Sequence, residues 1–151
     1  MQLADLMATD VLAVSPDTTI ADAALRMVAR DTGAAVVLED GGIVGVISER
    51  DLMRAIPDGC SRETPVSERM SRHVMTASPK TSVPEAMAMM IDGHFRHLPV
   101  VEAGRVLGIV SMRDLMSWAS LRLRLAPTEG DDEVDTAELL ATIHRMRTGA
   151  A

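Results

Sequence analysis

The chain repeats itself, and this duplication constrains its fold more than any other feature. Residues 7–53 align with residues 70–116 without a gap, at a shift of 63 residues. About a third of the aligned positions are identical, and most of the others keep their apolar character. A gapless internal match of this length indicates a duplicated structural unit. Because each unit alone is small for a hydrophobic core, we expect the two to pack together as one body.

Sequence signals predict the order β-α-β-β-α in both units, each behind a short helical turn. A Ser-Pro pair ends the first strand, a hydroxyl residue with an acid three positions later begins the helix, and a glycine turn joins the last two strands. In the first unit we expect a turn at Leu3–Met7, strands at Val11–Val14, Ala34–Leu38 and Ile43–Ile47, a helix that begins with Thr19 and Asp22, and a final helix after Ser48. In the second we expect a turn at Val66–Met70, strands at Val74–Ala77, His97–Val101 and Val106–Val110, a helix that begins with Ser82 and Glu85, and a final helix after Ser111.

The two units end in nearly the same sequence, GVISERDLM at 45–53 and GIVSMRDLM at 108–116. The shared polar residues are Ser48, Arg50 and Asp51 in the first unit and Ser111, Arg113 and Asp114 in the second. Each group lies where a buried strand meets a helix N-terminus, whose free N–H groups favour an anion such as phosphate. A serine and an arginine suit phosphate, and a carboxylate one turn later can accept from ribose hydroxyls. The same Ser-x-x-Asp spacing is also an ordinary capping box, which is the alternative interpretation.

The sequence resembles the cystathionine-β-synthase (CBS) domain, present as a tandem pair known as a Bateman module. The resemblance is carried by the order of elements, the repeat length, the two G-h-h-S-x-R-D endings (h, apolar) and RHLPVV at 96–101. It covers roughly residues 1–120 and implies an α+β fold, in which two β-α-β-β-α repeats pack as one pseudo-two-fold module with a C-terminal helix. The corresponding domains are repeat 1 at 1–60, repeat 2 at 61–125, and an acidic linker with a helix at 126–151.

The resemblance also implies which residues bind a ligand. In similar proteins the Ser or Thr of the ending contacts phosphate, the Asp holds the ribose hydroxyls, and adenine lies near the first two strands. Carried over position by position, the predicted ligand-binding residues are Thr9, Val11, Ser48, Arg50, Asp51, Val74, Arg96, His97, Pro99, Ser111, Arg113 and Asp114. Arg96 and His97 are expected to reach phosphates, whereas the first repeat has Gly33 and Ala34 at the equivalent positions. We therefore expect two unequal sites, the second better equipped for phosphates.

By this resemblance the chain is a regulatory module without catalytic activity that binds an adenosine-containing ligand between its repeats. The expected ligand is AMP, ADP, ATP, S-adenosylmethionine or NAD, which acts as a regulator rather than as a required cofactor. Modules of this kind pair through their exposed helices, so we expect a homodimer that signals to a regulated protein. The alternative is an interaction module with empty sites, whose function is dimerisation.

Composition argues against several other classes of protein. Aromatic residues make up 1% of the chain and the net charge is -7, which disfavours nucleic-acid binding through base stacking or phosphate contacts. There is no 18-residue apolar run for a membrane span, and the start MQLADLMATD lacks the basic and apolar regions of a secretory signal. The single cysteine, Cys60, suits a reducing compartment, so we expect a cytoplasmic protein.

No residues have the spacing of a catalytic or metal site. Cys60 has no histidine near it in the sequence to activate it, and we interpret it as a linker thiol. The four histidines show no zinc-type spacing with cysteine, so no metal site is expected. The twelve methionines are interpreted as adaptable core residues.

The tail after the second repeat predicts a separate helix. Pro127 ends the helix that begins at Ser111, and an acidic run follows at Thr128–Asp132. Beyond a cap at Asp135, the apolar residues that share one helical face are Leu139, Leu140, Ile143 and Met146. Because a helix of about a dozen residues is marginal alone in water, we expect this face to cover a surface, either on its own repeats or on the other subunit of the dimer. We favour the dimer, since the exposed helices of the repeats offer the largest apolar surface, and the alternative is a frayed terminus.

Overall fold

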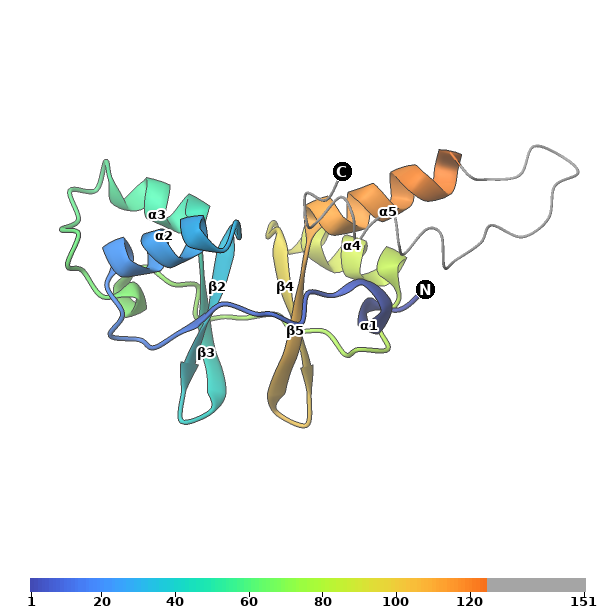
Figure 1. Cartoon of the computed structure of the whole chain (residues 1–151), viewed down its shortest axis with the longest axis horizontal. Helices are drawn as coiled ribbons and strands as arrows, with labels where there is room; N and C mark the ends of the chain where they lie inside the picture. The colour runs from blue at the N-terminus through green and yellow to red at the C-terminus, as the bar shows by residue number, and fades with distance from the viewer. Residues whose placement is uncertain (125–151) are drawn as a thin grey trace, which may run out of the picture.

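The chain forms two similar lobes that lie side by side (Figure 1). The computed structural model describes residues 1–124, so the predicted acidic linker and C-terminal helix at 126–151 lie outside the described residues. The first lobe contains β1 (Ala13–Val14), α2 (Ile20–Ala29), β2 (Ala34–Glu39), β3 (Gly42–Ser48) and α3 (Glu49–Ala55). The second contains α4 (Val83–Asp92), β4 (His97–Glu102), β5 (Arg105–Ser111) and α5 (Met112–Arg124). Two short turns, α1 (Leu3–Leu6) and a 3-10 helix (Val66–Glu68), precede the respective repeats.

Each lobe is built on a β-hairpin whose turn has the predicted chemistry. β2 pairs antiparallel with β3, and β4 with β5. Asp40 and Gly41 have φ of 50° and 80°, and Ala103 and Gly104 have φ of 48° and 77°. Two consecutive left-handed residues form the tight turn whose twist matches that of the flanking strands. The hairpin turns project at one end of the molecule, and the helices gather at the other (Figure 1).

The first strand of each repeat is shorter than predicted, and in the second repeat it is not a strand. Residues 13–14 pair in parallel with β2, and Leu12 still accepts a hydrogen bond from Val36 N at 2.9 Å. The prediction of a strand at Val74–Ala77 was wrong, because this segment is reduced to a single bridge between Ala77 and Val100. Pro99 occupies the position equivalent to Val36 and has no N–H to donate, which removes the corresponding hydrogen bond.

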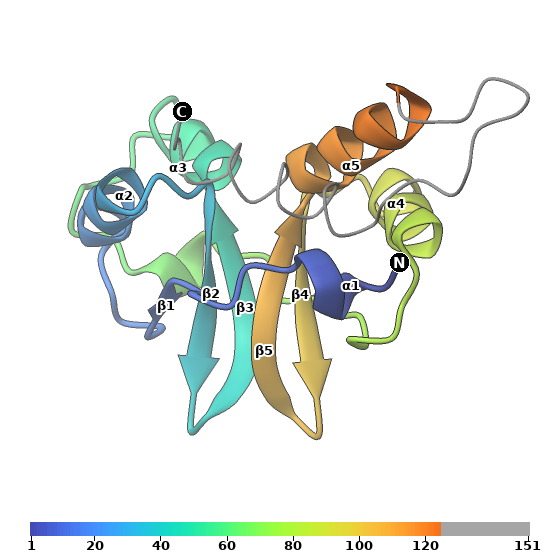
Figure 2. The same cartoon turned by 45° about the vertical axis from the view of Figure 1, so that its right-hand side comes forward.

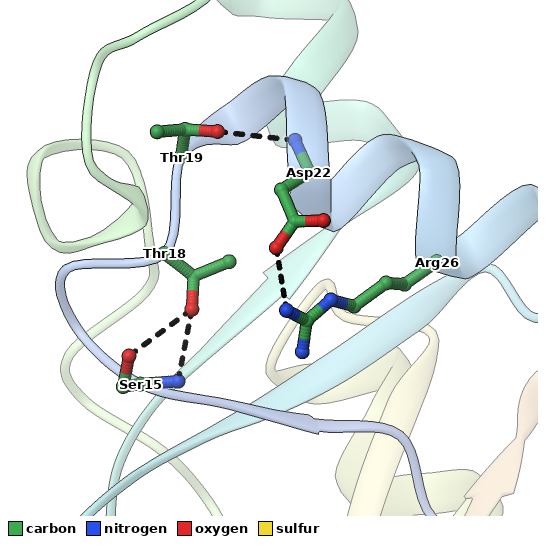
Figure 3. A network of polar contacts seen from close by, with 5 residues as sticks. All are labelled: Ser15, Thr18, Thr19, Asp22 and Arg26. Atoms are coloured by element: carbon green, nitrogen blue, oxygen red, sulfur yellow. Dashed lines mark hydrogen bonds and ion pairs between the residues drawn. The ribbon is translucent and has the colours of Figure 1, made fainter.

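The predicted helix starts are confirmed, but in both repeats only the hydroxyl half of the predicted capping box forms. Thr19 Oγ1 accepts from the backbone N–H of Asp22 at 3.1 Å, and Ser82 Oγ from that of Glu85 at 3.4 Å. The carboxylate of Asp22 does not complete the predicted capping box, because it pairs instead with Arg26 at 2.6 Å (Figure 3). Directly before this helix, Thr18 Oγ1 accepts from Ser15 N at 3.1 Å, and this hydrogen bond closes the turn that contains Ser15 and Pro16.

The leading turn of each repeat packs on the opposite lobe. Leu3 and Leu6 of α1 are buried in the core of the second lobe, and Val66 and Met70 are buried in the core of the first. Backbone hydrogen bonds fix both turns, from Leu3 N to Thr81 O at 2.9 Å and from Val66 N to Thr18 O at 2.8 Å. The two repeats therefore complete each other's cores, and neither lobe is a contiguous piece of sequence.

To reach the opposite lobe, each leading segment crosses a hairpin at a glycine. The N-terminal segment passes over β5 on its way to β1 (Figure 2), where Ala8 and Ile109 exchange backbone hydrogen bonds of 2.8 and 2.9 Å. A Cβ atom on Gly108 would lie 2.8 Å from Ala8 O, a distance that real Cβ contacts do not show. The linker crosses β3 in the same way, through paired hydrogen bonds between Val46 and Ser71 of 3.0 and 2.9 Å beside Gly45.

A third hydrophobic cluster joins the lobes between their sheets. Its buried members are Ala34 and Val36 from β2 and Ile109 from β5, and Ala8 and Val11 of the crossing segment pack against them. The predicted packing of two repeats into one pseudo-two-fold α+β module is confirmed. Among the helices of residues 1–124, none is both long and apolar enough to cross a membrane.

The crossing predicts a specific cost for a side chain at Gly108. Gly108→Ala should lower the free energy of unfolding by about 1–3 kcal/mol, because the added methyl group meets the backbone oxygen of Ala8 as well as the side chain of Met7, and the backbone cannot move aside as a side chain can. Gly42→Ala is the matched control, since its Cβ would lie 3.6 Å from Glu39 O, and its effect should stay within about 0.5 kcal/mol. Urea unfolding of the three proteins measures both effects, and equal stability of the two variants would contradict the close crossing.

Candidate functional site

The two Ser-x-x-Asp motifs fold alike at the junctions between strand and helix. In the first-repeat site, defined by Ser48 and Asp51, Asp51 Oδ2 accepts from Ser48 N at 2.8 Å and from Ser48 Oγ at 2.6 Å. In the second-repeat site, defined by Ser111 and Asp114, the corresponding distances are 3.0 and 2.7 Å. Asp114 N also donates to Ser111 Oγ at 3.2 Å. All four side chains are half-buried, so they are ordered and still reached by solvent.

These contacts show that the capping interpretation of the motif is correct. Each carboxylate accepts from the backbone N–H of its own serine and so stabilises the start of its helix. The same contacts hold each carboxylate in one orientation at the end of a buried strand. A carboxylate has about four lone-pair sites, so capping leaves it able to accept further donors. The role of these residues in ligand binding stays a prediction.

The register of the hairpins places the start of one strand beside the end of the next. Ala34 at the start of β2 lies opposite Ser48, and His97 at the start of β4 lies opposite Ser111. The residue before each strand accepts a hydrogen bond from the first residue of the following helix. These bonds run from Glu49 N to Gly33 O at 3.0 Å and from Met112 N to Arg96 O at 2.8 Å. The two sites thus share one backbone arrangement.

Gly33 lies beside side chains from both lobes. A Cβ atom at this position would lie 3.2 Å from His97 Nε2 and closer still to the carboxylate of Glu49. His97 of the second lobe therefore reaches the first lobe, where the missing side chain of Gly33 leaves room for it. The sequence pointed to His97 as a phosphate contact but gave no sign that Glu49 would lie beside it. In the sequence, position 49 differs from its equivalent in the second repeat, because Glu49 is charged and Met112 is apolar. This difference is the signal that could have pointed to Glu49.

The surroundings of His97 disfavour the charged form of its imidazole. Burial lowers the pKa of His97 below its ordinary value, and the neighbouring Arg96 lowers it further. Glu49 and Asp114 act in the opposite direction, and Arg113 adds a weaker lowering effect. His97 therefore feels charges from both sites and offers each of them a hydrogen-bonding group rather than a full positive charge.

The three predicted arginines lie in different places. The guanidinium of Arg50 is directed to the opposite lobe, where Nη1 is 3.5 Å from the carbonyl oxygen of His94. His94 ends the turn after α4 in a left-handed conformation, with φ of 55°. Arg96 and Arg113 are exposed, and both lie close enough to His97 to influence its pKa. The second-repeat site thus has two free cationic side chains near it, whereas Arg50 contacts a carbonyl group.

The residues predicted to contact adenine are less uniform. Thr9 is exposed, Val11 and Val74 are half-buried, and Pro99 is buried within β4, where its carbonyl accepts from Ala77 N at 3.0 Å. Val11 packs against the cluster that joins the lobes. It also lines an open pocket of about 340 Å³ between β1 and α2, together with Leu12, Ala13, Arg26, Ala29 and Arg30. This pocket contains neither a Ser nor an Asp of the two motifs.

Cys60 has a neighbour that the sequence did not reveal. Arg69 donates through Nη2 to Cys60 Sγ and through Nη1 to Asp58 Oδ2, the latter at 2.6 Å. These contacts hold the linker between the repeats against the 3-10 turn. Within residues 1–124, no group of three or more histidine, cysteine, aspartate or glutamate side chains is arranged to hold a metal ion.

Comparisons with known proteins identify the family of both repeats. The family model of the CBS domain matches twice, at residues 3–58 and 66–121. The CBS domain-containing protein YhcV of Bacillus subtilis is 38% identical over 112 residues, which cover 74% of this chain and 80% of the relative. An uncharacterized 17.7 kDa protein of Acidianus ambivalens is 35% identical over 116 residues, which cover 76% and 70%.

A solved structure shows the same fold at similar sequence identity. The CBS-domain containing protein ATU1752 from Agrobacterium tumefaciens is 36% identical, with a TM-score of 0.73, and the match covers 77% of this chain and 97% of that protein. The matched ranges contain both Ser-x-x-Asp motifs and both glycine crossings. The chain therefore belongs to the CBS domain family and carries the domain as a tandem pair.

Proposed function

We propose that the tandem pair is a regulatory module without catalytic activity, which binds an adenosine-containing ligand between its repeats and signals to a partner protein in the cytoplasm. The observation that carries this proposal is the duplicated geometry of the two motifs. Both hold a serine hydroxyl and an aspartate carboxylate in contact at a junction between a buried strand and a helix. The candidate ligands are AMP, ADP, ATP, S-adenosylmethionine and NAD.

Two solved CBS pairs with this fold were crystallised with adenosyl ligands. The CBS domain pair of MJ0100 was solved with 5′-methylthioadenosine and S-adenosyl-L-methionine, and it is 22% identical to this chain with a TM-score of 0.76. CBSX2 was solved in complex with AMP, and it is 24% identical with a TM-score of 0.67. The matches cover 81% and 82% of this chain. They support adenosyl ligands as the class to test first.

The motif offers suitable groups for such a ligand. A ribose presents two neighbouring hydroxyl donors, and a carboxylate fixed in orientation can accept from both. The serine hydroxyl now donates to the carboxylate, and rotation about its C–O bond would turn the proton toward a phosphate oxygen. The aspartate would keep its backbone donor in this exchange, so the helix cap would persist while ligand binds.

A second function, dimerisation, is favoured by the apolar residues on the outer helices. The exposed large apolar side chains of the helical elements are Leu25 and Val28 on α2, Met53 on α3 and Ile56 directly after it, Ile91 on α4, and Met116 and Leu123 on α5. Val28, Ile56 and Leu123 are 81, 77 and 79% exposed. Because exposed apolar side chains are enriched at interaction surfaces, we propose that two copies pair through these helices. If the ligand sites are empty, this pairing is the alternative function.

Loss of the ribose acceptors should weaken ligand binding. Asp51→Ala/Asp114→Ala should weaken the binding of AMP or S-adenosylmethionine by about 1.5–3 kcal/mol at each site, because each substitution removes hydrogen bonds to a charged acceptor. Calorimetric titration measures the change, and Asp17→Ala, an exposed acid outside both motifs, is the control. Thermal unfolding checks that loss of the two caps leaves the protein folded. Unchanged affinity in the folded double variant would contradict the proposed sites.

A charge on the outer helices should separate the dimer. Val28→Glu/Met116→Glu should raise the dissociation constant of the dimer by about 100-fold or more, because a buried carboxylate without a partner costs several kcal/mol. Sedimentation equilibrium gives the constant. Met75→Glu is the matched control, since Met75 is 47% exposed but lies outside the helices. A monomer in the unsubstituted protein would rule out this pairing.

A further inference from the structure

We infer that the two sites select ligands of different charge, and that Glu49 determines the difference. The first-repeat site takes a neutral or cationic adenosyl ligand, whereas the second-repeat site takes a phosphorylated one. This inference rests on the proposed function and assigns a ligand class to each site. It comes from the side chains beside the two motifs, which differ although the motifs and their backbone are alike.

The difference is an inversion of charge at two equivalent pairs of positions. Arg96 in the second repeat corresponds to Gly33 in the first, and Met112 corresponds to Glu49. The second-repeat site therefore has a cation and an apolar side chain where the first-repeat site has no side chain and a carboxylate. The charged residues of the motif itself are the same in both repeats, because Arg50 corresponds to Arg113 and Asp51 to Asp114.

The structure shows that the carboxylate of Glu49 fills the position that the missing side chain leaves. It lies against Gly33, within the volume that a Cβ atom would occupy. The hydrogen bonds Glu49 N to Gly33 O and Met112 N to Arg96 O are equivalent, at 3.0 and 2.8 Å. The backbone thus presents position 49 to the first-repeat site as it presents position 112 to the second. Arg96 would attract a phosphate at the second-repeat site, whereas Glu49 would repel a phosphate at the first-repeat site.

No nearby cation neutralises Glu49. Its carboxylate forms no ion pair within residues 1–124. His97 lies beside the same glycine as Glu49, and burial keeps the pKa of that imidazole below its ordinary value. Arg50 follows Glu49 in the chain, but its guanidinium is directed to the carbonyl of His94. The negative charge of Glu49 therefore remains available to oppose a phosphate and to attract a sulfonium or ammonium group.

The test compares two probes of different charge at one site. Asp114→Ala disables the second-repeat site, and calorimetry at pH 7.5 then measures the affinity of the first-repeat site for AMP and for 5′-methylthioadenosine. This site should prefer the uncharged 5′-methylthioadenosine. Glu49→Gln should tighten AMP binding by about tenfold and leave 5′-methylthioadenosine unchanged, because the amide keeps the size of the side chain and removes its charge. Glu102→Gln, an exposed residue at the hairpin end, is the matched control.

The reciprocal change tests the other site. With Asp51→Ala in place, Met112→Glu should weaken AMP binding by about tenfold and leave 5′-methylthioadenosine unchanged. Because Asp114 also caps α5, the same Glu49→Gln comparison is made in the otherwise unsubstituted chain. There the substitution should raise the number of tight AMP sites from one to two per chain.

The possible results separate the inference from the function on which it rests. If neither probe binds the unsubstituted protein, the proposed function fails and the inference fails with it. If both probes bind but Glu49→Gln leaves the ratio of their affinities unchanged, the function stands and the inference is overturned. A shift of that ratio toward AMP in Glu49→Gln, absent from Glu102→Gln, supports it.

Discussion

The close crossing of each leading segment over a glycine is the contact on which the rest of the structure depends. At Gly108 the backbone of Ala8 lies where a side chain would be, and paired hydrogen bonds with Ile109 hold it there. This crossing, and its counterpart at Gly45, lets each leading turn reach the opposite lobe and complete its core. Since neither core is closed by its own repeat, the lobes are coupled in folding, and the two Ser-x-x-Asp motifs keep a fixed relation to each other.

The pseudo-symmetry of the backbone also explains how the two sites can differ. Hydrogen bonds along the hairpins and at the helix starts are duplicated, so equivalent residues occupy equivalent places. Duplication then leaves side chains free to diverge without disturbing the fold. Gly33 and Glu49 on one side, and Arg96 and Met112 on the other, are such a divergence. The half-buried His97 lies between the two sites, in the electrostatic field of Glu49 and of Asp114.

The structural role of the Ser-x-x-Asp motif is compatible with the binding role that we propose for it. Asp51 and Asp114 cap their helices through the backbone N–H of the preceding serine. A carboxylate that holds a ribose needs a fixed orientation. The capping hydrogen bonds supply this orientation without any further residue. In the linker between the repeats, Arg69 donates hydrogen bonds to Cys60 and Asp58 and so joins them to the 3-10 turn that packs on the first lobe.

The sequence by itself determined the duplication, the order of elements, the hairpin turns and the caps at Thr19 and Ser82, because these depend on local pattern and on residues a few positions apart. It also located both Ser-x-x-Asp motifs. It did not reveal the loss of the strand at Val74–Ala77, since that depends on which strand Pro99 faces. Only the tertiary structure decided that the leading turns exchange lobes and that His97 and Glu49 both lie beside Gly33. These arrangements join residues far apart in the chain, and no local pattern encodes their proximity.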